Sequence, residues 1–260
     1  MGNVVSRIIS KVLANRLKSI LPNVISDSQS AFVPGRIITD NTTVAFEMFH
    51  RMRNRTKGRK GHMAVKLDIN KAYDRVEWEF LQRIMQKIGL PDQWVNLAME
   101  TVRTASYSTL INGEPRGFFT PTSGIKQGDP LSPYLFLLCA EGLSSLIRRA
   151  VDSQLLKGVM SCQGGVRVSH LLFTDDSLLF CEATIEECRN LLNILAMYER
   201  ASGQAINRQK TTLFFSPNTK LPMKLAIGNM LGAQIMTSCE KYLGLPMVGG
   251  KSKVSTFREV

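Results

Sequence analysis

Three aspartates stand at the ends of apolar segments, where carboxylates could bind a metal ion. Asp175 and Asp176 are adjacent, between the apolar runs 171–173 and 178–180. Neighbouring carboxylates in half-buried surroundings disfavour joint ionisation unless a cation or a shared proton compensates them. Asp68 ends a similar apolar segment. Hard oxygen ligands of this kind suit Mg²⁺, which usually also binds phosphate oxygens and water, so the pattern predicts phosphoryl-transfer chemistry.

Aspartate is also a common turn residue, so any one of these acids could simply end a strand. Their joint placement favours a shared site. Asp68 lies near the end of a predicted strand, 62–69, and the other two acids occupy the predicted turn between strand segments 167–173 and 177–181. A sheet that contains these strands could bring all three acids to one edge.

The remaining segments indicate an α+β chain. Apolar residues recur at helical or alternating spacing, and Pro22 is expected to end the first helix. Asn112 and Gly113 tolerate positive φ and predict a hairpin turn. The expected helices are 4–21, one from about 42, 76–88, 93–103, 132–150, 185–202 and 223–231; the further expected strands are 106–111, 116–120 and 211–215.

Charge points to a polyanionic partner. The 260 residues include 33 Lys and Arg against 21 Asp and Glu, which gives a net charge of +12. Nucleic acid is the first candidate partner. Six basic residues fall between Arg51 and Lys60, either as a phosphate-contacting loop or as a solvated helix end.

The cysteines and the apolar runs indicate in which cellular compartment the protein is expected. The five cysteines contain no C-x-x-C pair, so neither a zinc site nor a disulfide framework is expected. They are interpreted as reduced thiols, which fits the cytoplasm or the nucleus better than secretion. The longest apolar run is too short to cross a bilayer, so no membrane segment is expected.

Three motifs, in this order, resemble the palm motifs of reverse transcriptases from non-LTR (LINE-type) retrotransposons. They are LDINKAYDRVEW at 67–78, GIKQGDPLSPYLF at 124–136 and FTDD at 173–176. SGQAINRQKT at 202–211 resembles the motif that supplies a lysine near the triphosphate, and KYLGLP at 241–246 resembles the primer-gripping hairpin. The segments 26–41 and 4–18 resemble a fingers motif and the helix before it. The resemblance covers nearly the whole chain.

The resemblance implies a polymerase palm with a small antiparallel sheet backed by helices, together with a mostly helical fingers region. Residues 1–62 would be a partial fingers region and 63–240 the palm, with finger elements at about 92–122. Residues 241–260 would hold the primer-grip-like hairpin and a truncated end without a thumb.

The implied activity is RNA-directed DNA polymerisation with two divalent ions, Mg²⁺ or alternatively Mn²⁺. An RNA template, a DNA or RNA primer and deoxynucleoside triphosphates are the implied partners. Asp68 and Asp175 would bridge the two ions, and Asp176 would be the weaker metal ligand. Tyr73 matches the steric gate that rejects a 2′-hydroxyl.

Further roles are implied residue by residue. Gln127 and Gly128 would contact the template and the incoming nucleotide, where glycine permits close approach. Arg36 and Lys210 would hold the triphosphate and protonate the pyrophosphate. Asp74 is expected to cap the helix that follows it. Thr174 stands where the family commonly has alanine, a change that a tight turn should tolerate.

Two other functions fit parts of the same pattern. A catalytically silent, retrotransposon-derived fragment would bind nucleic acid through its basic surface alone. A palm-fold nucleotide cyclase would share the metal carboxylates but would need no template groove. The segment 124–136 and the charge of +12 count against the cyclase.

Overall fold

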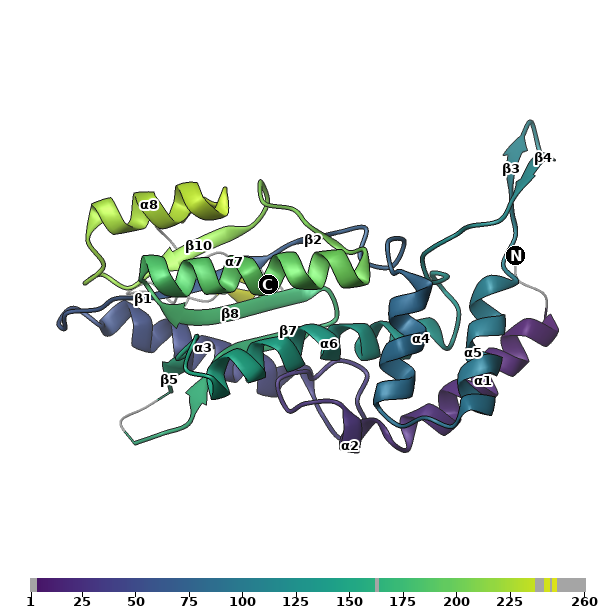
Figure 1. Cartoon of the computed structure of the whole chain (residues 1–260), viewed down its shortest axis with the longest axis horizontal. Helices are drawn as coiled ribbons and strands as arrows, with labels where there is room; N and C mark the ends of the chain where they lie inside the picture. The colour runs from purple at the N-terminus through teal and green to yellow at the C-terminus, as the bar shows by residue number, and fades with distance from the viewer. Residues whose placement is uncertain (1–3, 162–163, 237–240, 244, 247–260) are drawn as a thin grey trace.

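A computed structural model describes residues 4–161, 164–236, 241–243 and 245–246. It shows a mixed helix and sheet structure, which confirms the predicted α+β class (Figure 1). The sheet lies on one side of the molecule and a group of helices on the other, with one hairpin projecting from the helical side. The helices are α1 (Val4–Lys18), α2 (Leu21–Val24), α3 (Ile38–Asn54), α4 (Trp78–Lys87), α5 (Asp92–Arg103), α6 (Ser132–Asp152), α7 (Ile185–Ser202) and α8 (Leu221–Leu231).

The main sheet has five strands in the order β11-β10-β1-β8-β7. Its neighbours are antiparallel apart from the parallel pair β10 and β11. Its strands are β1 (His62–Leu67), β7 (His170–Phe173), β8 (Asp176–Glu182), β10 (Thr212–Phe215) and β11 (Gln234–Ile235). Four two-stranded pairs complete the fold: β2 (Ile69–Asn70) with β9 (Ala205–Ile206), β3 (Tyr107–Ile111) with β4 (Glu114–Phe119), β5 (Val159–Met160) with β6 (Arg167–Val168), and β12 (Lys241–Tyr242) with β13 (Leu245–Pro246).

The central strand β1 is buried on both faces. Met63, Val65 and Leu67 point to the core that α6, α7 and α8 share with the sheet. Ala64 lies on the opposite face, in the core that contains residues of α3. Side chains alternate across a strand, so this segment needs apolar residues at nearly every position. The rigid centre of the sheet therefore ends directly at Asp68.

The helical side has its own core. Leu81 and Met85 are one turn apart on α4 and fully buried, and they pack with residues of α1, α5 and the first half of α6. The long helix α6 contributes to this core and to the sheet core, so it joins the two sides of the molecule.

Several predicted boundaries were wrong. The first helix ends at Lys18, and Pro22 lies in the first turn of the separate helix α2, where a residue without an N–H costs no hydrogen bond. Helix α3 starts at Ile38, earlier than residue 42. The predicted strand 167–173 is two strands, since β6 pairs with β5 whereas β7 pairs with β8. Asp176 is the first residue of β8, so it is not in the turn.

The hairpin of β3 and β4 is confirmed, and every residue of its two strands is exposed. Asn112 and Gly113 have φ of 54° and 85°, as the two central residues of a type I′ turn require.

The described cysteines are Cys139, Cys181 and Cys188, and all three are buried free thiols. Burial raises the pKa of Cys139 to about 12 and that of Cys188 to about 11. Cys162 and Cys239 lie outside the described residues. Among the helices described, none has the length and apolarity needed to cross a membrane.

His170 on β7 should make stability depend on pH. Its ring is 2% exposed and lies within hydrogen-bond distance of Ser144 Oγ (2.8 Å) and Ser169 Oγ (2.9 Å). Burial, helped by Arg148, lowers its pKa from 6.5 to about 4. The unfolded chain therefore binds a proton that the folded chain excludes between those values, and stability falls as pH falls from 6.5 to 4.

The expected loss from this histidine is roughly 3 kcal/mol across that range. Urea denaturation at several pH values measures it. His170→Gln keeps a neutral hydrogen-bonding side chain and should remove this part of the pH dependence, leaving the part that comes from the buried His62, whose pKa is also lowered to about 4. The exposed His50→Gln should leave the profile unchanged. Equal profiles for the two variants would contradict this assignment.

Candidate active site

The sheet brings the predicted acids together at one edge. Because Leu67 pairs with Ser177, the end of β1 lies beside the start of β8. A small cavity of about 110 Å³ opens there. Its lining contains all three acids and the predicted lysine: Lys66, Leu67, Asp68, Ile69, Asp175, Asp176, Lys210 and Thr212.

Asp176 shows the electrostatic cost of this grouping. The carboxylate is half-buried, and its pKa is raised chiefly by burial, with smaller contributions from Asp175 and Asp68. Lys66 acts in the opposite direction. Carboxylates that repel one another in partly buried surroundings are compensated well by a divalent cation, and their oxygens are the ligands that Mg²⁺ prefers. The donor set therefore fits the implied metal.

The acids are near one another but not in coordinating positions. Among the described residues, no three His, Cys, Asp or Glu side chains are arranged so that they could hold one ion as they lie. The Asp175 carboxylate accepts a hydrogen bond from the Thr174 hydroxyl (Thr174 Oγ1 to Asp175 Oδ1, 2.8 Å).

Thr174 occupies a strained place in the turn between β7 and β8. Its φ is 51°, a left-handed conformation that is unusual for a β-branched residue. Its hydroxyl also lies 2.7 Å from the carbonyl oxygen of Phe173. Strained backbone tends to gather at functional sites, and here it lies directly before Asp175.

The Thr174 hydroxyl should contribute to stability through these contacts. Thr174→Val keeps the shape but loses the donor, and we expect it to lower the free energy of unfolding by about 1 kcal/mol. Thr174→Ser keeps the donor and serves as the control, with urea denaturation as the measurement. If serine and valine are equally destabilising, the hydroxyl has no such role.

Lys210 is placed by the loop that follows β9. The backbone N–H of Asn207 donates to the carbonyl oxygen of Asp68 (2.8 Å), and the Asn207 side chain donates to Asn70 Oδ1 (3.1 Å). The N–H groups of Lys210 and Thr211 in turn donate to the Asn207 carbonyl oxygen. These bonds hold the lysine segment directly against the segment that carries Asp68.

Tyr73 is half-buried and stacks on Phe136, with ring centroids 4.7 Å apart and planes 8° from parallel. Burial, and then the negative charge of Asp175, raises the pKa of its hydroxyl. This electrostatic influence puts the ring in the neighbourhood of the acids. Phe136 lies on α6 and ends the second motif, 124–136, so the second motif supports Tyr73 of the first.

The segment that contains Gln127 and Gly128 docks against the turn before α4. Gly124 has φ of 88°, and a Cβ there would lie 2.6 Å from the Asp74 carbonyl oxygen, so only glycine fits. Gln127 is exposed and donates to Asp74 Oδ1 at 3.3 Å. Gly128 is exposed, with open space where a side chain would be.

The expectation that Asp74 caps the following helix was wrong. Helix α4 begins at Trp78 with Glu77 at its N-cap position, so its free amides lie too far along the chain. The Asp74 carboxylate accepts the bond from Gln127 instead.

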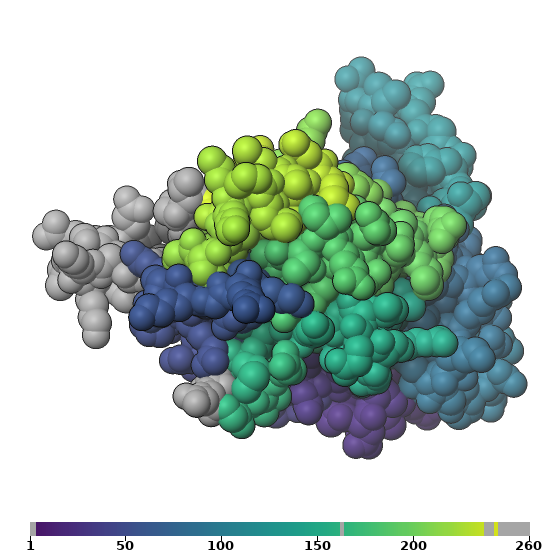
Figure 2. Space-filling model, turned by 60° about the vertical axis from the view of Figure 1, so that its left-hand side comes forward, coloured from purple at the N-terminus to yellow at the C-terminus, as the bar shows by residue number. Residues whose placement is uncertain are grey.

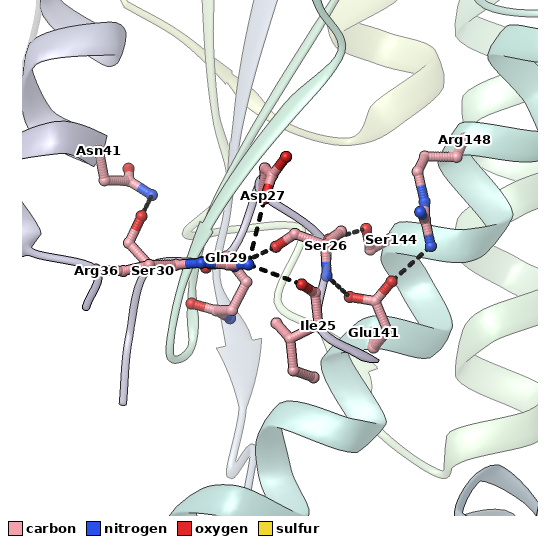
Figure 3. A network of polar contacts seen from close by, with 10 residues as sticks. All are labelled: Ile25, Ser26, Asp27, Gln29, Ser30, Arg36, Asn41, Glu141, Ser144 and Arg148. Carbon is pink, nitrogen blue, oxygen red and sulfur yellow. Dashed lines mark hydrogen bonds and ion pairs between the residues drawn. The ribbon is translucent and has the colours of Figure 1, made fainter. Parts of the chain in front are cut away.

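Arg36 does not line this cavity and belongs to a network in which the segment 25–41 contacts α6 (Figure 3). Its guanidinium donates to the carbonyl oxygens of Ser26 (2.5 Å), Gln29 (2.6 Å) and Ile25 (2.9 Å). It also pairs with Asp27 at 3.3 Å, and only 18% of its side chain is exposed. The structure therefore does not bring Arg36 into the cavity with Lys210.

The same network contains functional candidates that the sequence did not indicate. Asn41 is buried, and its amide donates to the carbonyl oxygen of Leu172 on β7 (3.0 Å). The segment next to Arg36 forms a parallel bridge to β7, with the Leu172 N–H donating to Ser28 (2.7 Å). Glu141 on α6 accepts from the Ser26 N–H and pairs with Arg148. Glu141 is an acid within the largely apolar sequence of α6, which was the one signal available for it, whereas Asn41 on α3 stands among other polar residues.

Comparison with known proteins identifies the family. The model of the family described as "Reverse transcriptase (RNA-dependent DNA polymerase)" matches residues 1–247. A Pol polyprotein from the type-1 retrotransposable element R2 of Popillia japonica is 32% identical over 167 residues, which is 64% of this chain and 26% of that protein. The transposon TX1 149 kDa protein of Xenopus laevis is 29% identical over 211 residues, 79% of this chain and 15% of that protein.

Two further similarities agree. An uncharacterized mitochondrial protein of Arabidopsis thaliana is 53% identical over 68 residues, 26% of this chain and 56% of that protein. A Candida tropicalis telomerase structure shares the fold, with a TM-score of 0.59 at 12% identity over 92% of this chain and 35% of that chain. The chain thus spans between 15% and 56% of the curated relatives named here. On the family match and the order of its motifs, the chain belongs to the reverse transcriptase family, alongside non-LTR retrotransposon proteins.

Proposed function

We propose that this chain is the catalytic part of an RNA-directed DNA polymerase, which extends a primer with deoxynucleoside triphosphates on an RNA template. The observation that supports this most is the cavity that gathers Asp68, Asp175, Asp176 and Lys210 from three separate segments of the chain. Three acids and two lysines, Lys66 and Lys210, in one cavity suit a reaction in which charge develops on phosphate oxygens.

Two divalent ions, Mg²⁺ in the first instance, would be held by Asp68 and Asp175, with Asp176 as the weaker ligand. When bound, such ions activate the primer 3′-hydroxyl and stabilise the leaving pyrophosphate. Lys210 is exposed at the cavity and would place a cation, and a transferable proton, near the pyrophosphate oxygens. The Tyr73 ring would lie under the sugar, and Gln127 and Gly128 would contact the template and the nucleotide.

Arg36 is better assigned to positioning. A guanidinium that already donates to three backbone carbonyl oxygens has few donors left for a triphosphate. We propose that it fixes the segment 25–41 against β7, which leads into Asp175.

The division into regions follows from the same proposal. Residues 1–62 would form the partial fingers and 63–240 the palm, with finger elements at about 92–122. The pair β12 and β13 would belong to the primer-grip-like hairpin of the region 241–260, of which residues 247–260 lie outside the described residues.

A primer-extension assay tests the activity. The chain is incubated with a primed RNA template, deoxynucleotides and Mg²⁺, and binding to the same template is recorded in parallel. Extension that requires the divalent ion supports the proposal. Binding without extension under Mg²⁺ and under Mn²⁺ would favour the alternative, a catalytically silent fragment that binds nucleic acid. The net charge of +12 is the observation that favours this alternative, because it suits nucleic-acid binding without catalysis.

A further inference from the structure

A second charged region lies far from the acids. It comprises Arg51, Arg53, Arg55, Lys57, Arg59 and Lys60, hereafter the basic surface. It runs from the last turn of α3 into the loop before β1, and apart from the half-buried Arg51 and Arg55 these side chains are exposed. Figure 2 shows the blue chain around residue 50 at the molecular surface.

The basic surface and the acids lie at opposite ends of β1. His62, at its start, pairs with Glu182, whereas Leu67, at its other end, pairs with Ser177 beside the acids. Six strand residues at about 3.3 Å each separate the two by roughly 20 Å. The basic surface is therefore a different site from the catalytic cavity.

The backbone of this loop is held in place. The Asn218 amide nitrogen lies 3.0 to 3.2 Å from the carbonyl oxygens of Lys57, Gly58 and Lys60. At Gly61 a Cβ would come within 1.9 Å of the Thr219 hydroxyl oxygen, so the chain packs closely there. The cationic side chains thus extend from a fixed loop, which lowers the entropy cost of binding a ligand.

The positive charge is poorly compensated. Of the six residues, only Lys60 forms an ion pair in the part of the chain that the structure describes, with Glu182 at 3.0 Å. Lys157 shares that same acid at 3.6 Å.

The field of these cations reaches the buried His62. Its pKa is lowered to about 4 mainly by burial and then by Arg55, with further contributions from Arg51 and Arg167, while Glu182 opposes them. An open cavity of about 390 Å³ lies beside these groups, lined by Glu47, His50, Arg51, Asn54, Arg55 and Ser161.

The shape and chemistry favour nucleic acid as the ligand. Six cations along ten residues match a row of phosphates, whereas a single phosphate could engage only one or two of them. A membrane surface would call for exposed apolar side chains beside the charges. The one apolar residue in the segment, Met52, is 0% exposed.

We propose that the basic surface binds the phosphate backbone of an RNA strand outside the catalytic cavity. The choice of RNA rests on the proposed function, but binding there requires no catalysis. The surface would add an anchor for the strand about 20 Å from the acids, across the length of β1.

The test compares two triple variants that each lower the net charge from +12 to +9, since 12 − 3 = 9. The first is Arg53→Gln, Lys57→Gln and Arg59→Gln, all exposed positions. The control is Arg83→Gln, Lys87→Gln and Arg200→Gln, exposed positions outside the basic surface. Binding of a 30-nucleotide single-stranded RNA is measured by fluorescence anisotropy at several salt concentrations, and a thermal melt confirms that each variant is folded.

Loss of three phosphate contacts should lower the salt slope by about 2 and weaken binding about 100-fold at 0.1 M salt in the first variant only. Equal losses in both variants would show that net charge alone matters and would overturn the proposal. So would unchanged RNA binding together with lost binding to phosphatidylserine vesicles. Repeating the comparison with Asp175→Asn as background separates this inference from the proposed activity, because an inactive chain should show the same difference.

Discussion

Replacing Asp175 by asparagine should reduce primer extension at least about 1,000-fold while leaving the affinity for the RNA template unchanged. Asparagine has nearly the same size but no negative charge, so it binds a divalent ion poorly. A metal ion supplies several kcal/mol of transition-state stabilisation, and about 4 kcal/mol corresponds to three orders of magnitude in rate. Asp175 is exposed and lines the cavity with Asp68 and Asp176, so the substitution should not disturb the core.

The measurement is single-turnover extension of one nucleotide, with template affinity from anisotropy. Asp152→Asn is the matched control, because that residue is exposed at the end of α6 and remote in sequence from the acids. It should extend normally. If Asp175→Asn extends at the normal rate, the cavity is not the polymerase site, and the assignment of the metal ligands is wrong.

Shortening Tyr73 should change which sugar the enzyme accepts. Tyr73→Val removes the ring that stacks on Phe136 at 4.7 Å and so opens space where that ring lies. If that ring excludes the 2′-hydroxyl, ribonucleotide incorporation relative to deoxynucleotide incorporation should rise about 10- to 200-fold, the range that small steric differences in a pocket can supply.

The ratio of kcat/KM for UTP and dTTP opposite a template adenine measures this effect. Tyr107→Val, on the exposed strand β3, is a control that removes the same atoms from a surface position. A variant that extends more slowly with both nucleotides at an unchanged ratio would make Tyr73 a packing residue and not a gate.

Helices and strands that are specified by residues within or next to the element could be predicted well from the sequence. Helix α7 was predicted at its observed bounds because both ends carry cap residues. Thr184 accepts from the Glu187 N–H at one end, and Gly203 adopts φ of 74° at the other. The strand β1 was evident because a strand buried on both faces has an almost continuous apolar sequence.

Features that depend on distant partners could not be predicted. Asn41 and the Leu172 carbonyl oxygen are 131 residues apart, and Ser26 and Glu141 are 115 apart. Neither contact produces a periodic or compositional pattern in the amino-acid sequence. The motif resemblance implied that Arg36 binds the triphosphate. In the structure, its N–H groups instead donate to backbone carbonyl oxygens of its own loop, and the sequence did not show these contacts. The three acids were found because Asp68 follows an apolar strand and Asp175 and Asp176 lie between two apolar segments.

The contacts between the segment beside Arg36 and β7 also affect how this protein can associate with a second molecule. Strand β7 lies at the edge of the main sheet, and an edge strand offers unpaired N–H and C=O groups to which another chain can add. At Leu172 both groups are already used, because its N–H donates to Ser28 and its carbonyl oxygen accepts from Ser30 and Asn41. The loop therefore protects the sheet at Leu172, close to the turn that contains Asp175, from pairing with a strand of a second molecule.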